Sequence, residues 1–205
     1  FNRGIDRRPT FTSKREFQRA VQTINFYRFS KPPISLSKFL RLETKKQNDV
    51  LDIILQSKHL IDIFCYCLMP NHFHFLLKQT EDGGISKFLS NLQNSYTKFF
   101  NLSHERDGSL FLDQFKAVRI ETDEQLIHVS RYIHLNPHTG YVVKSLEELE
   151  NYQWSSFPDY LQEKSTVVDV DFILNFFGKQ SYSKFVFDQA DYQRRLKEVE
   201  HLLLE

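Results

Sequence analysis

The hydrophobic and polar positions of the chain follow two periods, which predict both helices and strands. Apolar residues at helical spacing predict a helix that is capped by Thr12 or Ser13, with Glu16 as the capping-box partner of Ser13, and that runs to about Phe29. Strands are expected at residues 58–67 and 72–79, and further helices at residues 85–102 and 123–135. Because helices and strands intersperse along the chain, we predict an α+β fold in which helices cover a mostly antiparallel sheet.

Weaker patterns predict three more elements. A short helical segment is expected at residues 37–41. Residues 48–56 fit either a short helix or a strand. Residues 110–120 predict a further strand.

The C-terminal part of the chain differs from the rest in its pattern. From Asp159 onward apolar groups recur at helical spacing, and residues 188–204 predict a charged amphipathic helix. The length of 205 residues and the hydrophobic share of 40% suit one well-buried core with extensions. We therefore predict a globular domain over residues 1–158 and a helical C-terminal extension over residues 159–205.

Two features bear on where the protein works. No apolar run approaches the roughly 20 residues that a membrane span needs, and no signal peptide is visible, so we expect a cytoplasmic location and no membrane partner. Cys65 and Cys67 stand two positions apart in one predicted strand and are poorly placed to bridge each other. We interpret them as reduced core residues; a zinc site built on them would need further ligands. Because the sequence starts at Phe1 without Met, we expect the natural N-terminus upstream.

Positive charge is concentrated near the start of the chain, although the net charge of the whole is only +1. Residues 1–46 carry twelve Lys and Arg against three Asp and Glu, a net charge of +9, and the remainder carries −8. Such a surface is the electrostatic footprint of a protein that binds a phosphate backbone. A solvated basic helix face would give the same asymmetry, so both interpretations stay open.

Two histidines one residue apart are the clearest chemical signal in the chain. Side chains at i and i+2 of a strand point to the same face, so His72 and His74 are expected about 6.6 Å apart on one face. Phe73, Phe75 and Leu77 are expected to fill the other face. Two imidazoles at this spacing can share one metal ion; histidines satisfied by hydrogen bonds near a sheet edge are the alternative.

Tyr96 lies on the apolar stripe of the helix that follows the histidine strand, so it should face inward. Taken alone, this position is typical of a packed core tyrosine. Next to the two histidines it suggests a nucleophile, because a phenol is weak at neutral pH and needs the developing negative charge to be stabilised. A metal held by His72 and His74 would polarise a phosphodiester oxygen for in-line attack by the Tyr96 oxygen. The product would be a phosphotyrosine link and a free hydroxyl.

Six short segments of the sequence form a recognisable series between residue 1 and about residue 157. They are Phe1-Asn2-Arg3-Gly4-Ile5-Asp6-Arg7, Cys67-Leu68-Met69-Pro70-Asn71-His72-Phe73-His74, Ser95-Tyr96-Thr97-Lys98-Phe99-Phe100-Asn101, Gly108-Ser109-Leu110-Phe111, Arg131-Tyr132-Ile133-His134-Leu135-Asn136-Pro137 and Trp154-Ser155-Ser156. In this order they resemble the single-tyrosine HUH transposases, and within them the REP-associated tyrosine transposases.

The resemblance implies a fold, a reaction and a metal. The fold is a ferredoxin-like sheet with helices on one side, whose first strand would lie mostly before Phe1. The reaction is the cleavage and rejoining of single-stranded DNA near hairpins, through a covalent 5′-phosphotyrosine on Tyr96. The metal is Mg²⁺ or Mn²⁺ held by His72 and His74. The residues alone would not have selected that ion, because imidazole favours zinc and the later transition metals.

The resemblance also implies a third metal ligand from the helix that carries the tyrosine. Phe100, one turn after Tyr96, cannot coordinate a metal. Asn101 is the nearest polar candidate, about 140° around an ideal helix from Tyr96. Gln93, one turn before the tyrosine, is the rival, and we expect Asn101.

Basic residues near the start of the chain are expected to hold hairpin or strand phosphates. Such contacts position DNA without reading its bases. The residues expected in this role are Arg3, Arg7, Arg8, Lys14 and Arg15.

The last two resembling segments are interpreted as mainly architectural. Arg131, His134 and Asn136 stand near a helix end, where Asn136 before Pro137 predicts a stop and Gly140 a closing residue. Trp154 could stack on a base, although a core tryptophan is the simpler interpretation.

Two other functions fit the same residues. A nucleic-acid-binding module without catalysis, such as a repressor derived from a transposase, would keep the basic face and need no metal. A metal-dependent phosphodiesterase would use an activated water and leave no link between protein and DNA. Monomer and homodimer both stay open, because the C-terminal extension could cover either a sheet face or a partner surface.

Overall fold

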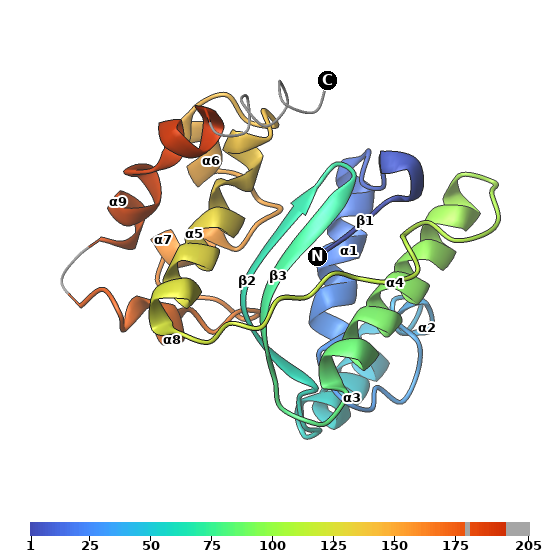
Figure 1. Ribbon diagram of the computed structural model, residues 1–205. Coiled ribbons are helices and arrows are strands. Elements are labelled where there is room, and N and C mark those ends of the chain that lie inside the picture. The colour runs from blue at the N-terminus through green and yellow to red at the C-terminus, as the bar shows by residue number, and fades with distance from the viewer. Residues whose placement is uncertain (179–180, 196–205) are drawn as a thin grey trace. The chain divides into compact units, whose positions relative to one another are not determined.

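The computed structural model describes residues 1–178 and 181–195 and combines helices with a small sheet (Figure 1). The strands are β1 (Asn2–Arg3), β2 (Ile61–Met69) and β3 (His72–Gln79), in the order β1-β3-β2. The first helices are η1 (Ile5–Arg7, of 3₁₀ type), α1 (Lys14–Tyr27), α2 (Leu36–Phe39), α3 (Thr44–Leu55) and α4 (Gly84–Ser103). The later helices are α5 (Asp123–Thr139), α6 (Leu146–Glu150), α7 (Phe157–Leu161), α8 (Val170–Leu174) and α9 (Tyr182–Phe187). This antiparallel sheet with helices packed on it and C-terminal helices confirms the predicted fold class.

These elements fall into two compact units. The first unit contains Phe1, residues 63–76 and the described residues from Lys116 to 195, and so holds most of β2 and β3 together with α5 to α9. The second unit contains residues 2–62 and 77–115, with α1 to α4. The boundary expected between residues 158 and 159 stays a prediction.

In the second unit, α1 and α4 lie side by side (Figure 1). α1 begins at a capping box, in which Ser13 Oγ accepts from the backbone N–H of Glu16 and the Glu16 carboxylate accepts from the N–H of Ser13. α4 begins after two glycines. Gly83 has a φ of +68°, and Gly84 approaches the Leu60 carbonyl oxygen so closely that a Cβ would not fit.

The core of the second unit includes a hydrophobic cluster built from α1, α2, α3 and the adjoining loop. Because Ile54 of α3 is 1% exposed and packs into this cluster, residues 48–56 form a helix and not a strand for nearly their whole length. The buried members of the cluster are Phe26, Phe29, Leu36, Phe39 and Ile54.

In the first unit, main chain from the C-terminal half covers the outer edge of β2. The N–H of Leu68 donates to the Trp154 carbonyl oxygen (2.8 Å), and the N–H of Asp169 donates to the Ile63 carbonyl oxygen (2.8 Å). These bonds satisfy backbone groups that an edge strand would otherwise expose. β2 is accordingly buried at all but one of its positions.

The strand predicted at residues 110–120 is wrong. Leu110 and Phe111 are buried, and Phe111 forms an isolated bridge with Gly4. Beyond them the chain is irregular and mostly exposed, and Val118 is 86% exposed. The apolar residues of this run do not share one buried face, so they cannot hold a strand against a core.

The helix end predicted at Asn136 and Pro137 is also wrong, whereas Gly140 is the closing residue as predicted. α5 continues through Pro137 to Thr139. A proline in the last turn of a helix lacks one N–H and therefore removes only one helical hydrogen bond.

Two further observations concern helices. The amphipathic helix predicted over residues 188–204 lies partly outside the described residues, and residues 190–195 are helical. Within the part of the chain that the structure describes, no helix combines the length and apolar character of a membrane span.

Candidate metal and nucleophile site

β3 carries His72 and His74 with their rings close together. The ring centroids lie 5.0 Å apart and the rings are nearly perpendicular, at 83°. Both imidazoles are partly exposed, whereas Phe73 between them is 1% exposed. Phe75 and Leu77 are only partly buried, so the opposite face of the strand is less completely covered than predicted.

A hydrogen bond fixes the tautomer of His72. Its Nδ1 lies 2.7 Å from Asn71 Oδ1. An amide oxygen only accepts, so Nδ1 carries the proton and Nε2 keeps the lone pair of the neutral ring. Histidines that bind metals commonly donate their second ring N–H in this way. His72 therefore meets the requirements of a metal ligand through Nε2.

Tyr132, on α5, contacts the ring of His74 within the first unit. The two ring centroids lie 5.6 Å apart at 86°, an edge-to-face arrangement. Tyr132 is 47% exposed, so a phosphodiester could approach its phenol from solvent. A reachable phenol beside a candidate metal ligand is what a tyrosine nucleophile requires.

Asn136 follows Tyr132 by one helical turn, about 40° around the helix. Its Nδ2 donates to the Tyr132 carbonyl oxygen at 3.0 Å, so Oδ1 is the atom with lone pairs for a metal. No cluster of three His, Cys, Asp or Glu side chains in the described ranges could hold a metal, so a third protein ligand must be of another type. Two imidazoles and one amide oxygen, completed by water, could hold a divalent cation: the imidazoles favour zinc and the later transition metals, whereas the amide oxygen and water suit Mn²⁺ or Mg²⁺.

Buried hydrogen bonds anchor α5 in the first unit. His134 is 0% exposed, with Nδ1 2.8 Å from the Tyr182 hydroxyl and Nε2 2.8 Å from Ser156 Oγ. Ser156 Oγ in turn accepts from the backbone N–H of Tyr66 on β2 at 2.9 Å. Burial lowers the pKa of His134 to about 3, so the ring is neutral. This chain of contacts joins β2 to the helix that carries Tyr132, and it agrees with the architectural interpretation of His134.

Tyr96 is enclosed in the second unit. It is 1% exposed, and its hydroxyl donates to the Thr10 carbonyl oxygen at 2.6 Å. The rings of Phe11 and Phe111 lie 5.0 Å and 6.0 Å from its own. Burial raises the pKa of the Tyr96 phenol far above its usual value. The predicted inward orientation is confirmed, and the catalytic role of Tyr96 stays a prediction.

The two residues predicted as third metal ligands belong to the second unit and have other partners there. Asn101 Nδ2 donates to the Gly108 carbonyl oxygen (2.9 Å), and Asn101 Oδ1 accepts from Arg106 (2.6 Å). Gln93 Oε1 accepts from Asn2 Nδ2 (2.7 Å). Each amide oxygen therefore already has a donor, and each side chain joins two parts of the unit.

The two cysteines are free thiols and fully buried. Burial raises the pKa of Cys65 to about 12 and raises the pKa of Cys67 as well. Because the thiolate is the form that binds metals, these thiols are poor ligands. The alternative of a zinc site built on them gains no support.

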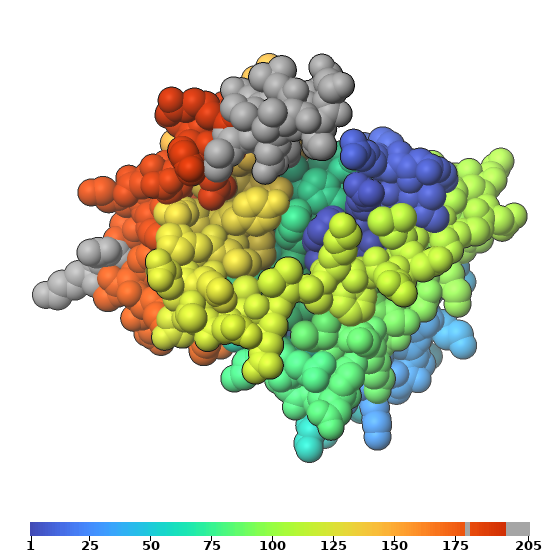
Figure 2. Space-filling model, viewed as in Figure 1, coloured from blue at the N-terminus to red at the C-terminus, as the bar shows by residue number. Residues whose placement is uncertain are grey.

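The basic residues predicted to hold phosphates are in the second unit, on the N-terminal segment that Figure 2 shows at the surface in dark blue. Arg7, Lys14 and Arg15 are exposed, and Arg3 and Arg8 are half-buried. Arg8 forms an ion pair of 3.2 Å with a neighbouring aspartate. The charge is displayed to solvent, and its role in binding DNA stays a prediction.

Tyr132 and Asn136 were not predicted as site residues, although the sequence holds a signal for them. Asn136 can supply a ligand one turn after Tyr132, whereas Phe100 cannot do so one turn after Tyr96. The proline after Asn136 suggested a helix end and so concealed this pattern.

Residues 37–136 match the family described as Transposase IS200 like. The matched segment contains His72, His74, Tyr96 and Tyr132 and ends at Asn136. No curated protein and no solved structure matches the chain with significance. The match supports a relationship of this chain to the IS200-like, single-tyrosine transposases, and with it a transposase-type function that acts on DNA.

Proposed function

We propose that the chain is a metal-dependent transesterase for single-stranded DNA, which cleaves and rejoins strands near hairpins, and that Tyr132 is its nucleophile. The observation that most supports this choice is the contact of 5.6 Å between the exposed Tyr132 ring and His74. Tyr96, which sequence reasoning favoured, is proposed as a core residue, because its burial disfavours the phenolate.

The proposed step exchanges one phosphoester bond for another. The Tyr132 oxygen forms a bond to phosphorus, the bond from phosphorus to the 3′-oxygen breaks, and a 5′-phosphotyrosine results. The phenol loses its proton, and the departing 3′-oxygen gains one. Attack of a 3′-hydroxyl on the phosphotyrosine reverses these changes and rejoins a strand.

The residues around Tyr132 have distinct parts in this proposal. His72, His74 and Asn136 would hold Mg²⁺ or Mn²⁺, which when bound polarises a phosphate oxygen as a Lewis acid. His134 and Ser156 keep α5 in place, so that the Tyr132 phenol is positioned before DNA arrives.

A covalent-adduct assay tests the proposal. The full chain is incubated with an end-labelled hairpin oligonucleotide carrying a single-stranded flank, with Mn²⁺, and the products are separated under denaturing conditions. We expect a protein–DNA adduct in the wild type and in Tyr96→Phe, and none in Tyr132→Phe or after chelation of the metal. An adduct that survives Tyr132→Phe and is lost in Tyr96→Phe would return the nucleophile to Tyr96.

The same assay separates the other functions. Cleavage without a protein link, in the wild type and in both Phe variants, would indicate a phosphodiesterase that uses water. DNA binding with no cleavage in the presence of either metal would indicate a binding module or repressor.

We also propose that the chain falls in the REP-associated subgroup, on the strength of the six resembling segments. A hairpin substrate should then be cleaved in preference to an unstructured strand of the same length.

The free thiols of Cys65 and Cys67 support a reducing compartment such as the cytoplasm. Sedimentation equilibrium would distinguish a monomer from a homodimer.

A further inference from the structure

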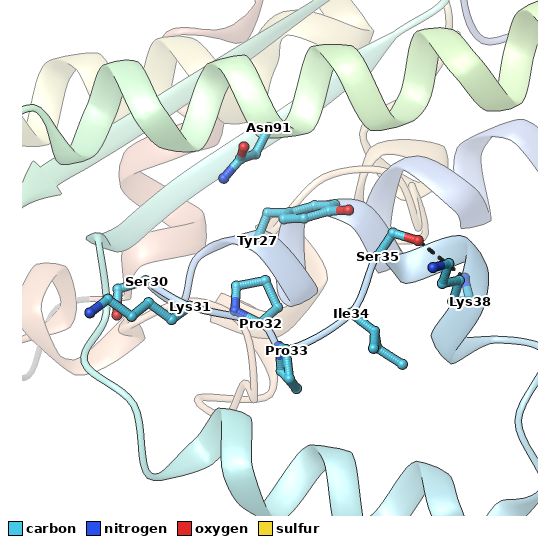
Figure 3. A pocket seen from close by; sticks show the side chains of 9 residues that line it. All are labelled: Tyr27, Ser30, Lys31, Pro32, Pro33, Ile34, Ser35, Lys38 and Asn91. Carbon is cyan, nitrogen blue, oxygen red and sulfur yellow. Dashed lines mark hydrogen bonds between the residues drawn. The ribbon is translucent and has the colours of Figure 1, made fainter.

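A cleft of about 590 Å³ opens on the surface of the second unit (Figure 3). It lies between the end of α1, the loop of residues 30–35 and Asn91 on α4. Its size is in the range of sites that hold small ligands. The function proposed above assigns no role to it.

Tyr27 supplies an aromatic surface in this cleft. Figure 3 shows its ring between the loop on one side and Asn91 on the other. The Tyr27 hydroxyl accepts from the N–H of Leu36 at 3.3 Å, and the ring contacts Phe26 edge-on with centroids 5.1 Å apart. These contacts fix the ring, which is only partly buried, so a base could stack on it with little ordering cost.

Two lysines give the cleft a positive charge. Figure 3 shows Lys31 and Lys38 toward opposite ends of the cleft, and both residues are exposed. No Asp or Glu lines the cleft, and no carboxylate of the described residues forms an ion pair with either lysine. Both lysines belong to the segment of residues 1–46 with its net charge of +9. The charge thus suits a ligand that carries phosphates.

The loop of residues 30–35, which forms one wall of the cleft, contains two prolines and is therefore stiff. Pro32 and Pro33 each have a fixed φ, so this wall has few conformations to lose when a ligand binds. Asn91 adds an amide that can donate to and accept from the edge of a base.

We propose that this cleft binds one nucleotide of single-stranded DNA, with the base on Tyr27 and the flanking phosphates at Lys31 and Lys38. The inference rests on the proposed function in one respect, that single-stranded DNA is the substrate. The cleft has no part in the chemical step; it holds the strand.

Photocrosslinking tests the position of the base. An unstructured oligonucleotide with a single 5-iododeoxyuridine is bound to the full chain, irradiated and digested, and the peptides are analysed by mass spectrometry. We expect an adduct on Tyr27, because this base analogue reacts with the aromatic ring on which it stacks. The analogue is placed at each position of the oligonucleotide in turn. If crosslinks form only on residues other than Tyr27 at every position, the proposal is overturned.

A matched pair of lysine variants tests the phosphate contacts. Lys31→Gln with Lys38→Gln is compared with Lys45→Gln and Lys46→Gln, two exposed lysines of α3 in the same basic segment. We expect about a 10-fold rise in Kd for the first pair, measured by fluorescence anisotropy, and a smaller change for the second. The slope of log Kd against the logarithm of the salt concentration should fall by about 1.4 for the first pair, since each contact with a single-strand phosphate contributes about 0.7 to this slope. Equal effects in the two pairs would contradict the proposal.

Variants of Tyr27 separate stacking from folding. Tyr27→Phe keeps the ring and should bind DNA within about 2-fold of the wild type, whereas Tyr27→Leu should bind about 10-fold more weakly. If Tyr27→Phe binds DNA as weakly as Tyr27→Leu does, the stacking role is overturned.

If the cleft does not bind DNA, the Tyr132 adduct still forms, and the lysine pair leaves its yield unchanged. If the transesterase proposal fails, the crosslink to Tyr27 and the lysine effects on Kd are still observed without any covalent adduct.

Discussion

Two tyrosines on two helices lie in opposite environments. Tyr96 of α4 is 1% exposed, and its hydroxyl donates a hydrogen bond to the backbone carbonyl oxygen of Thr10. Tyr132 of α5 is 47% exposed and contacts His74. A buried phenol contributes packing and is kept neutral, whereas an exposed phenol contributes little to stability and can meet a substrate. An inward position on an apolar stripe therefore buries a phenol, even next to a promising motif.

The largest expected difference between the two tyrosines is in stability. Tyr96→Ala should lower the free energy of unfolding by about 3–5 kcal/mol, because it leaves a cavity among aromatic rings and removes the hydrogen bond to the Thr10 carbonyl oxygen. Tyr132→Ala should change it by about 0.5 kcal/mol or less. Urea unfolding followed by circular dichroism measures both. Similar losses in the two variants would break the comparison.

The two helices should also differ in their response to acid, because α5 is anchored by a buried histidine. His134 has a pKa of about 3 in the folded protein, against about 6.5 when unfolded. Between these values only the unfolded state binds the proton, so the free energy of unfolding falls as the pH drops below about 6.5. The slope approaches about 1.4 kcal/mol per pH unit and totals about 3 kcal/mol by about pH 4. In His134→Gln the free energy of unfolding should depend less on pH over this range, as measured by urea unfolding at a series of pH values. Parallel pH profiles for the wild type and the variant would argue against the role of His134 as the anchor of α5.

A smaller effect is expected when the anchor of α5 loses one hydroxyl. Ser156→Ala leaves His134 Nε2 and the Tyr66 N–H without their partner, which should cost about 2 kcal/mol. Adduct formation by Tyr132 should fall as well, since α5 is less well positioned. Ser103→Ala, an exposed serine at the end of α4, is the control and should change stability by about 0.5 kcal/mol or less.

The smallest expected effect concerns the cap of α1, which also reaches α4. Burial raises the pKa of Glu16, but hydrogen bonds from His104 and Thr12 outweigh it, so the pKa lies below its usual value. Glu16→Gln should cost about 1 kcal/mol at neutral pH. Because the folded-state pKa is lowered, this contribution is present above the unfolded pKa of about 4.3 and is lost as the pH falls through the folded value. The difference between wild type and variant should shrink in acid, while the exposed Glu121→Gln should show no difference at any pH.

Much of the fold follows from local patterns in the sequence. β3 has the predicted bounds, and α4 begins and ends within a residue of its prediction, because a strong apolar period and two glycines mark it. The capping box of α1 was predicted from Ser13 and Glu16 alone. The run at residues 110–120 was misjudged as a strand because its composition suits one while its apolar residues find no common face.

For the candidate site, the sequence by itself determined the histidine pair. The two-residue period of a strand places His72 and His74 on one face wherever that strand packs. Only the tertiary structure decided which tyrosine ring contacts His74, because the contact between residues 74 and 132 depends on how a distant helix is anchored. That anchor is the buried chain from Tyr66 through Ser156 to His134, whose hydrogen bonds join segments remote in sequence and have no periodic signature. Local spacing dictates the direction of a side chain, and long-range packing dictates its neighbours.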